Sequence, residues 1–116
     1  MPSAAFEVYA DRIGEYRFRF TCGDGVARLR ASEGYTAKAN ALKAVESVRK
    51  NALLEQRYDF KQNNRGKHFC TVKARNGNIL AVSRNHVSYD ELLDDVEAIK
   101  AEVEGASLST ASLNVA

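Results

Sequence analysis

Two stretches in the first half of the chain carry arginines at every second position. Arg17 and Arg19 alternate with aromatic residues, and Arg28 and Arg30 alternate with small or aliphatic residues. A period of two is typical of a strand, whose successive side chains point to opposite faces of a sheet. Because neighbouring strands lie ~4.8 Å apart, the four guanidinium groups would project together from one face. Guanidinium binds phosphate oxygens in pairs, so the pattern predicts a candidate anion-binding face.

The matching face in the second half of the chain is aromatic and aliphatic. We expect it to carry Phe69, Thr71, Lys73, Ile79 and Ala81. An aromatic surface beside a basic one is suited to stacking the bases and binding the phosphates of a single-stranded nucleic acid. Phe69 therefore joins the candidate face. The open face of an antiparallel sheet is also commonly solvated, or covered by a tail or a partner subunit, and these alternatives stay open.

The register of the strand around Phe69 has two interpretations. Regular alternation places Phe69 on the open face, where an exposed ring favours a dimer seam or a docking site for the tail. A bulge near Gly66 would shift the register by one residue. Phe69 would then point inward, and His68 and Cys70 would point outward. The sequence leaves both registers open.

Residues with catalytic or metal-binding chemistry are sparse. His68 and His86 are the two histidines, and the spacing places no carboxylate beside either, as a general base requires. Cys22 and Cys70 form no Cys-x-x-Cys pair. The acidic residues within 90–97 follow no calcium-loop spacing and fit the first turn and solvated face of a helix. We therefore predict no catalytic residue, no metal site and no cofactor, and a protein that is not an enzyme.

Composition and charge are those of an ordinary globular protein. The 116 residues are 45% hydrophobic and 28% charged, with a net charge of +2. Nine basic and six acidic residues lie in 1–52, seven and two in 53–89, and one and seven in 90–104. No apolar run approaches the ~18–20 residues of a membrane span, and the N-terminus lacks the pattern of a signal peptide. We expect a cytoplasmic protein with reduced thiols and no membrane partner.

The chain reads as two similar halves. Shifting the sequence on itself by about 52 residues aligns Asp24-Gly25 with Asn76-Gly77, two strong hairpin turns between alternating runs. Each half then reads strand, turn, strand, hairpin turn, strand, turn and helix. In the first helix, Thr36 is the expected cap. In the second, Ser88 and Glu91 form a capping-box pattern.

A strand–strand–strand–helix unit of about 50 residues cannot cover its own apolar faces. We therefore predict an α+β two-layer fold in which two tandem units share one antiparallel sheet, with both helices on one face. The predicted single domain, 1–116, comprises a first repeat at 5–52, a linker at 53–57, a second repeat at 58–103 and a Ser/Ala-rich tail at 104–116. The tail is either disordered or forms a short strand around Ser112–Val115.

Several segments of the first half resemble the repeat of the YegP-like family. They are Asp24-Gly-Val-Ala27, Ser32-Glu-Gly-Tyr35, Ala37-Lys-Ala39 and Val45-Glu-Ser-Val-Arg-Lys-Asn-Ala52. The resemblance implies tandem repeats joined in one sheet, a C-terminal strand exchanged between units, and dimers where a member has a single repeat. It implies no activity, cofactor or ligand. The second half departs from the pattern, because Ser83-Arg-Asn-His86 replaces Ser-Glu-x-Tyr. Glu33 and Tyr35 therefore form a candidate turn site that occurs once.

Together these observations predict a small non-enzymatic binding or interaction module. Its partner is unspecified, and a second copy or another protein would fit an open sheet face or edge. The alternative is nucleic-acid binding through the basic open face. The sequence does not identify the ligand, the oligomeric state or the biological process.

Overall fold

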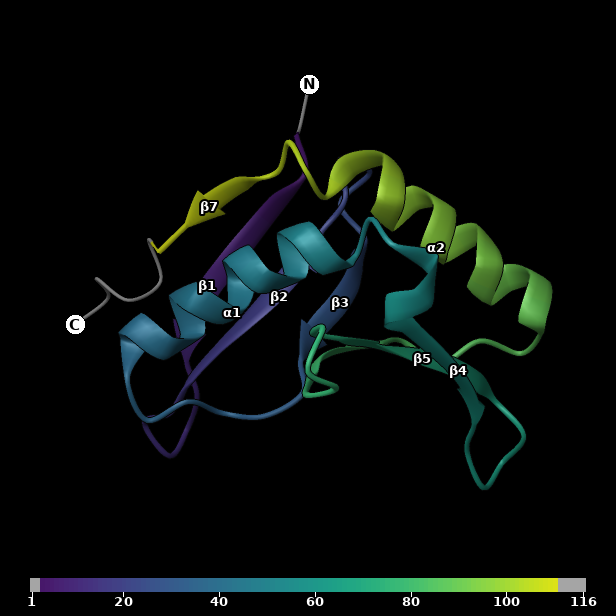
Figure 1. The fold of residues 1–116 in the computed structure, drawn as a ribbon, viewed down its shortest axis with the longest axis horizontal. Helices are drawn as coiled ribbons and strands as arrows, with labels where there is room; N and C mark the ends of the chain where they lie inside the picture. The colour runs from purple at the N-terminus through teal and green to yellow at the C-terminus, as the bar shows by residue number, and fades with distance from the viewer. Residues whose placement is uncertain (1–2, 111–116) are drawn as a thin grey trace.

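The computed structural model describes residues 3–110, which form one seven-stranded sheet and two α-helices (Figure 1). The first half contains β1 (Ala5–Ala10), β2 (Tyr16–Thr21), β3 (Ala27–Ala31) and α1 (Lys38–Asn51). A short 3-10 helix, η1 (Glu55–Arg57), leads into the second half. That half contains β4 (Tyr58–Gln62), β5 (His68–Lys73), β6 (Ile79–Ser83), α2 (Tyr89–Glu102) and β7 (Ser107–Ser109).

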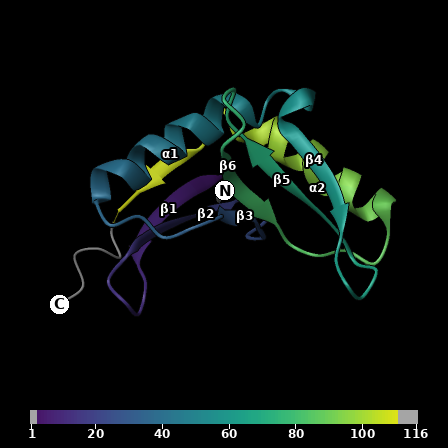
Figure 2. The same ribbon diagram turned by 60° about the horizontal axis from the view of Figure 1, so that its bottom comes forward.

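The sheet is open and mostly antiparallel, with the strand order β4-β5-β6-β3-β2-β1-β7. The third strands of the two halves, β3 and β6, pair antiparallel at its centre and join the halves into one sheet. Figure 2 shows the two halves of the sheet sloping away from this central pair. The predicted α+β fold is confirmed. Both halves have the expected element order, while their origin as repeats stays a prediction.

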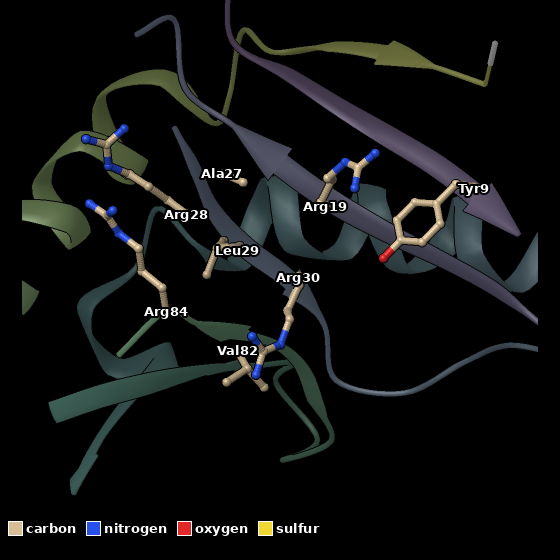
Figure 3. Close-up of a pocket in the computed structure, with 8 residues that line it drawn as sticks. All are labelled: Tyr9, Arg19, Ala27, Arg28, Leu29, Arg30, Val82 and Arg84. Carbon is tan, nitrogen blue, oxygen red and sulfur yellow. The ribbon is translucent and has the colours of Figure 1, made fainter. Parts of the chain in front are cut away.

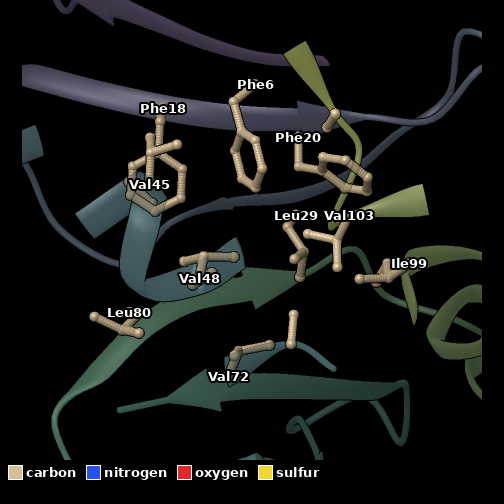
Figure 4. Close-up of a cluster of buried hydrophobic side chains, with 14 of the residues drawn as sticks. Phe6, Phe18, Phe20, Leu29, Val45, Val48, Val72, Leu80, Ile99 and Val103 are labelled. Atoms are coloured by element: carbon tan, nitrogen blue, oxygen red, sulfur yellow. The ribbon is translucent and has the colours of Figure 1, made fainter. Parts of the chain in front are cut away.

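One hydrophobic core lies between the sheet and both helices. Phe6, Phe18 and Phe20 enter it from β1 and β2 and are fully buried. Figure 4 shows Phe18 and Phe20 in one cluster with Val45 of α1 and with Val103, which follows α2. Both helices therefore cover the same face of the sheet, as predicted, and the opposite face is open.

The hairpin between the second and third strands contains a β-bulge in each half. Phe20 pairs with Leu29 and Thr21 with Ala27, so Arg28 is the extra residue. In the second half, Val72 pairs with Ala81 and Lys73 with Ile79, so Leu80 is the extra residue. A bulge redirects the side chain of its extra residue. This redirection decides where Arg28 points.

The helix caps agree with the sequence in one case of two. The side chain of Ser88 accepts a hydrogen bond from the backbone N–H of Glu91, as predicted. The predicted cap of α1 is wrong by one residue, because the helix begins after Ala37 and no side chain caps it. Thr36 therefore lies outside the helix.

The tail forms a strand earlier than predicted. β7 pairs with β1, and this pairing is parallel, whereas the other strand pairs of the sheet are antiparallel as predicted. The strand predicted at 112–115 lies outside the described residues. Arg49 of α1 holds the connection from α2 to β7, because its Nη1 donates to the carbonyl oxygens of Val103, Glu104 and Ala106 at 3.3, 3.0 and 2.6 Å.

Replacing Arg49 by Met is expected to lower the free energy of unfolding by about 1.5–3 kcal/mol, the usual contribution of hydrogen bonds to a charged group. Methionine keeps an apolar stem near Phe6, whose ring lies 5.2 Å from the guanidinium carbon. The loss of unfolding free energy should therefore reflect the hydrogen bonds from Arg49 to the carbonyl oxygens. Urea unfolding measures the stability change, and hydrogen exchange at 107–109 measures release of β7. Lys50→Met, at the exposed neighbouring position, is the matched control, and an equal effect of both changes would contradict this role.

Candidate functional site

The open face of the sheet carries a cavity of about 230 Å³ lined by four arginines (Figure 3). Its lining residues are Tyr9, Arg19, Ala27, Arg28, Leu29, Arg30, Val82 and Arg84. In Figure 3 the Arg30 guanidinium lies beside Val82, and the Arg28 and Arg84 guanidiniums lie next to each other at one end. The structure thus brings together three of the four predicted arginines and adds Arg84, which sequence reasoning missed.

The cavity is built on one row of residues that crosses the sheet. Successive strand pairings place these residues directly opposite one another in the order Glu7, Arg19, Arg30, Val82, Thr71 and Asp59. Directly opposite residues project from the same face of a sheet. The Oγ1 atom of Thr71 is the one buried side-chain oxygen or nitrogen in residues 3–110 that has no hydrogen-bond partner. The row therefore contains one buried hydroxyl without a partner, that of Thr71.

Two of the predicted arginines are neutralised by carboxylates on neighbouring positions. The Nε of Arg17 donates to Asp11 at 2.9 Å, and Arg19 forms an ion pair with Glu7. Arg19 also lies over the ring of Tyr9, 4.8 Å from its centroid. Arg30 differs, because it is exposed and its side chain forms no hydrogen bond or ion pair within the described part of the chain. Arg30 is thus the free cation of the cavity.

Arg28 lines one end of the cavity, but the bulge keeps it from projecting straight out of the open face with the other three, which corrects the prediction. The bulge turns its side chain toward α2, where Nε donates to Asp95 at 3.0 Å. Its two terminal nitrogens donate to Asp24 at 2.8 and 2.9 Å. These hydrogen bonds lower the pKa of Asp24 to about 2. Strict period-two counting failed at this residue because it cannot detect a bulge.

Asp95 is the centre of a buried ion cluster that sequence reasoning missed. It accepts hydrogen bonds from Arg84 at 2.8 and 2.9 Å, and from Arg28 at 3.0 Å. His86 Nε2 lies 2.7 Å from Asp95 Oδ2. Burial opposes ionisation of the Asp95 carboxyl, but the hydrogen bonds from Arg84, Arg28 and His86 prevail and lower its pKa.

The sequence placed Asp95 on a solvated acidic face, but only 3% of the residue is exposed. The signal was available, because position 95 falls at helical spacing between the buried Leu92 and Ile99 of the apolar stripe. His86 and Asp95 are in contact, although the sequence spacing had placed no carboxylate beside either histidine. They line a cavity of about 420 Å³ with Arg28, Arg84, Glu91 and Asp94.

The candidate turn site lies at a different cleft. Glu33 and Tyr35 line a cleft of about 700 Å³ between α1 and the β5–β6 hairpin. The backbone of Tyr35 is fixed by two hydrogen bonds with Tyr16 at 2.7 and 2.8 Å. The structure thus places both residues together, away from the arginine-lined cavity.

Comparison with known proteins identifies the family. The family model described as "Domain of unknown function (DUF1508)" matches residues 11–59. A Stutzerimonas stutzeri protein named "UPF0339 protein in ptx operon 5'region" is 39% identical over 98 residues, which cover 84% of this chain and 87% of that protein. The chain belongs to the UPF0339 family. The resemblance seen in the sequence is therefore confirmed, and the family is one of unknown function.

Solved structures of UPF0339 proteins share the fold. The solution structure of YegP from Escherichia coli, described as a protein of unknown function, has a TM-score of 0.87 and 27% identity, and the match covers 96% of this chain and 95% of that one. The UPF0339 protein SO3888 from Shewanella oneidensis has a TM-score of 0.88 over 97% and 94% of the two chains. At 23% identity, the second match supports the fold alone.

In this UPF0339 chain the register around Phe69 is the regular one. Phe69 pairs with Lys61 and projects from the open face, half-buried, while Cys70 lies fully inside the core. Burial raises the pKa of the Cys70 thiol to about 11, so it remains protonated at neutral pH. Ala81 was predicted on the open face and is wrongly placed, because the bulge at Leu80 turns it into the core.

Within 3–110, no group of three or more His, Cys, Asp and Glu side chains is arranged to hold a metal ion. None of the helices in that range is both long enough and apolar enough to cross a membrane.

Proposed function

We propose that this UPF0339 chain is a non-enzymatic binding module whose open sheet face binds a phosphate-bearing ligand at Arg30. The observation that carries the proposal is the free guanidinium of Arg30 in a cavity whose other arginines are paired. Arg19, Arg28 and Arg84 each have a carboxylate partner. Guanidinium without a partner presents its full set of donors to an incoming anion.

The size and lining of the cavity support a single anionic group. Its volume of about 230 Å³ lies below the ~300–1,000 Å³ of pockets that enclose a whole small molecule. Leu29 and Val82 line it beside Arg30 and give the cavity an apolar wall. A phosphate seated on Arg30 would leave the rest of the ligand on the open face.

An extended nucleic-acid strand is supported less well than a single phosphate. Backbone binding needs several free cations along a track, and carboxylates neutralise Arg17 and Arg19 on this face. Phe69 offers a half-buried ring on the same face, on which a base can stack. The titration described next therefore includes oligonucleotides.

Replacing Arg30 by Gln is expected to weaken phosphate binding about tenfold or more, since a charge-assisted hydrogen bond contributes roughly 1.5–3 kcal/mol. Backbone amide shifts would be followed by NMR during titration with inorganic phosphate, adenosine monophosphate, and single-stranded and duplex oligonucleotides at two salt concentrations. Arg65→Gln is the matched control, because Arg65 is exposed in the turn between β4 and β5.

The titration distinguishes the sources of the phosphate. Binding of the mononucleotide with shifts around Arg30 supports the proposal, and tighter binding of single strands identifies nucleic acid as the ligand. Absence of binding by every probe at low salt would overturn it. An equal response of the Arg30→Gln and Arg65→Gln variants would also overturn it.

A further inference from the structure

The cleft at the turn before α1 has chemistry unlike that of the arginine-lined cavity. It lies between α1 and the β5–β6 hairpin and has a volume of about 700 Å³. Seven polar side chains line it, namely Glu33, Tyr35, Asn40, Lys43, Ser47, Asn76 and Asn78. Ala44 and Leu80, both buried in the core, contribute apolar surface. This combination of an apolar base and convergent polar groups is typical of a small-molecule site.

The cleft occupies the same place in the first half as the Asp95 cluster occupies in the second. In both halves the start of the second strand is hydrogen-bonded to the turn before the helix. Tyr16 pairs with Tyr35, and His68 pairs with His86, through N–H to oxygen distances of 2.7–2.8 Å. The two extra residues of the bulges, Leu80 and Arg28, line the two sites. The backbone framework is therefore shared.

The side chains on this shared framework differ. In the second half, Arg28, Arg84 and His86 all bind Asp95 of α2. In the first half, the helix presents Ala44 to its cleft and the bulge presents Leu80. An alanine and a leucine cannot form a network of ion pairs. The first cleft is consequently the larger of the two, at about 700 Å³ against about 420 Å³.

Five of the seven polar side chains that line the larger cleft have no partner within the described part of the chain, and four of these five are exposed. Within residues 3–110, the side chains of Glu33, Tyr35, Asn40, Lys43 and Asn78 form no hydrogen bond or ion pair. Glu33 and Lys43 have opposite charges and line the same cleft, yet no ion pair joins them. Burial, with the charge of Glu33, raises the pKa of Tyr35, so its hydroxyl stays a donor at neutral pH.

The turn that carries Glu33 and Tyr35 is held in place from behind. A Cβ atom added at Gly34 would collide with the side chain of Glu15. Gly34 is thus required by a close approach rather than by an unusual backbone angle. Together with the backbone bonds of Tyr35, this contact fixes the turn before any ligand arrives. A preformed site loses less conformational entropy on binding.

We infer that this cleft binds a small zwitterionic ligand of the amino-acid class. Glu33 binds the ammonium group and Lys43 binds the carboxylate. The amides of Asn40 and Asn78 can donate to or accept from the same groups, and the ligand's side chain lies over Ala44 and Leu80. This site is separate from the phosphate site on the open face, and the inference does not depend on that proposal.

The test is an NMR titration of the full chain with each free L-amino acid, and with its N-acetyl and carboxamide derivatives, at millimolar concentration. We expect at least one free amino acid to shift the amides of Tyr35, Lys43 and Asn78, and the blocked derivatives to bind about tenfold or more weakly, because each lacks one charge. Glu33→Gln and Lys43→Gln should each weaken binding by about tenfold or more. Ala44→Leu should abolish binding by filling the cleft.

Two control variants separate this site from other effects. Arg65→Gln and Arg30→Gln should leave amino-acid binding unchanged. Retained binding in Arg30→Gln would show that the cleft binds its ligand without the phosphate site. The inference is overturned if no free amino acid shifts the cleft amides. It is also overturned if blocked derivatives bind as tightly as free ones, or if Glu33→Gln and Lys43→Gln bind like the unmodified protein.

Discussion

Replacing Asp95 by Asn is expected to lower the free energy of unfolding by about 3–5 kcal/mol, because it removes the buried negative charge that Arg28, Arg84 and His86 share. Arg28 would keep its contact with Asp24, but its Nε would lose the charged partner it has at 3.0 Å. Arg84 would lose both of its bonds to Asp95, and His86 would lose its carboxylate. Urea unfolding at neutral pH measures the change.

The pH dependence of stability provides a second measurement of the same cluster. The pKa of Asp95 is lowered in the folded protein. Its stabilising contribution is therefore fully present above the unfolded value of about 3.9 and is lost as the pH falls through the lower folded value. The difference in stability between the unmodified protein and Asp95→Asn should consequently shrink as the pH falls below about 4.

Asp94→Asn is the matched control for this prediction. Asp94 is the exposed neighbour on the same helix, and its loss should change the free energy of unfolding by no more than about 0.5 kcal/mol. Equal stabilities of the Asp95→Asn and Asp94→Asn variants would show that the cluster does not stabilise the fold. A difference that stays constant through the acid range would contradict the lowered pKa.

Replacing Phe20 by Ala is expected to cost about 3–5 kcal/mol of unfolding free energy, the usual effect of emptying an aromatic site in a core. Phe20 is fully buried, and its ring centroid lies 5.0 Å from that of Phe6. It belongs to the same buried core cluster as Val103 after α2, so this core joins the first half of the chain to the second (Figure 4). We expect one cooperative transition at lower urea, with an unchanged m-value.

Two probes test whether the halves unfold together in the Phe20→Ala variant. Far-ultraviolet circular dichroism follows the helices, and hydrogen exchange reports the strands of each half separately. Ile13→Ala is the control, because Ile13 is 78% exposed in a turn. It should change stability by no more than about 0.5 kcal/mol. Separate transitions for the two halves would contradict a single cooperative domain.

The course of the chain through its elements was predictable from local patterns. The alternation of Tyr16, Phe18 and Phe20 predicted a strand with a buried face, and the Asp24-Gly25 turn predicted the hairpin after it. Ser88 predicted the start of α2. These features depend on neighbours within a few residues, because backbone hydrogen bonding and side-chain periodicity are local. The α+β class followed from them.

The candidate sites depended on contacts that local patterns do not contain. The bulge that turns Arg28 away from Arg19 and Arg30 arises where the register of two paired strands changes, and this involves residues on both strands. The contact of His86 with Asp95 crosses from a turn to a helix face. The cleft at Glu33 is open because Ala44 and Leu80, from different elements, meet there.

The sequence by itself determined the first six strands, both helices, the buried aromatic stripe of the first half and the membership of a family with an unassigned function. Only the tertiary structure decided which charged groups are paired and which are free. The physical reason is that an ion pair depends on distances of about 3–4 Å between groups far apart in sequence. Arg30, left without a carboxylate, and the unpaired charges of Glu33 and Lys43 became visible only after folding placed their neighbours.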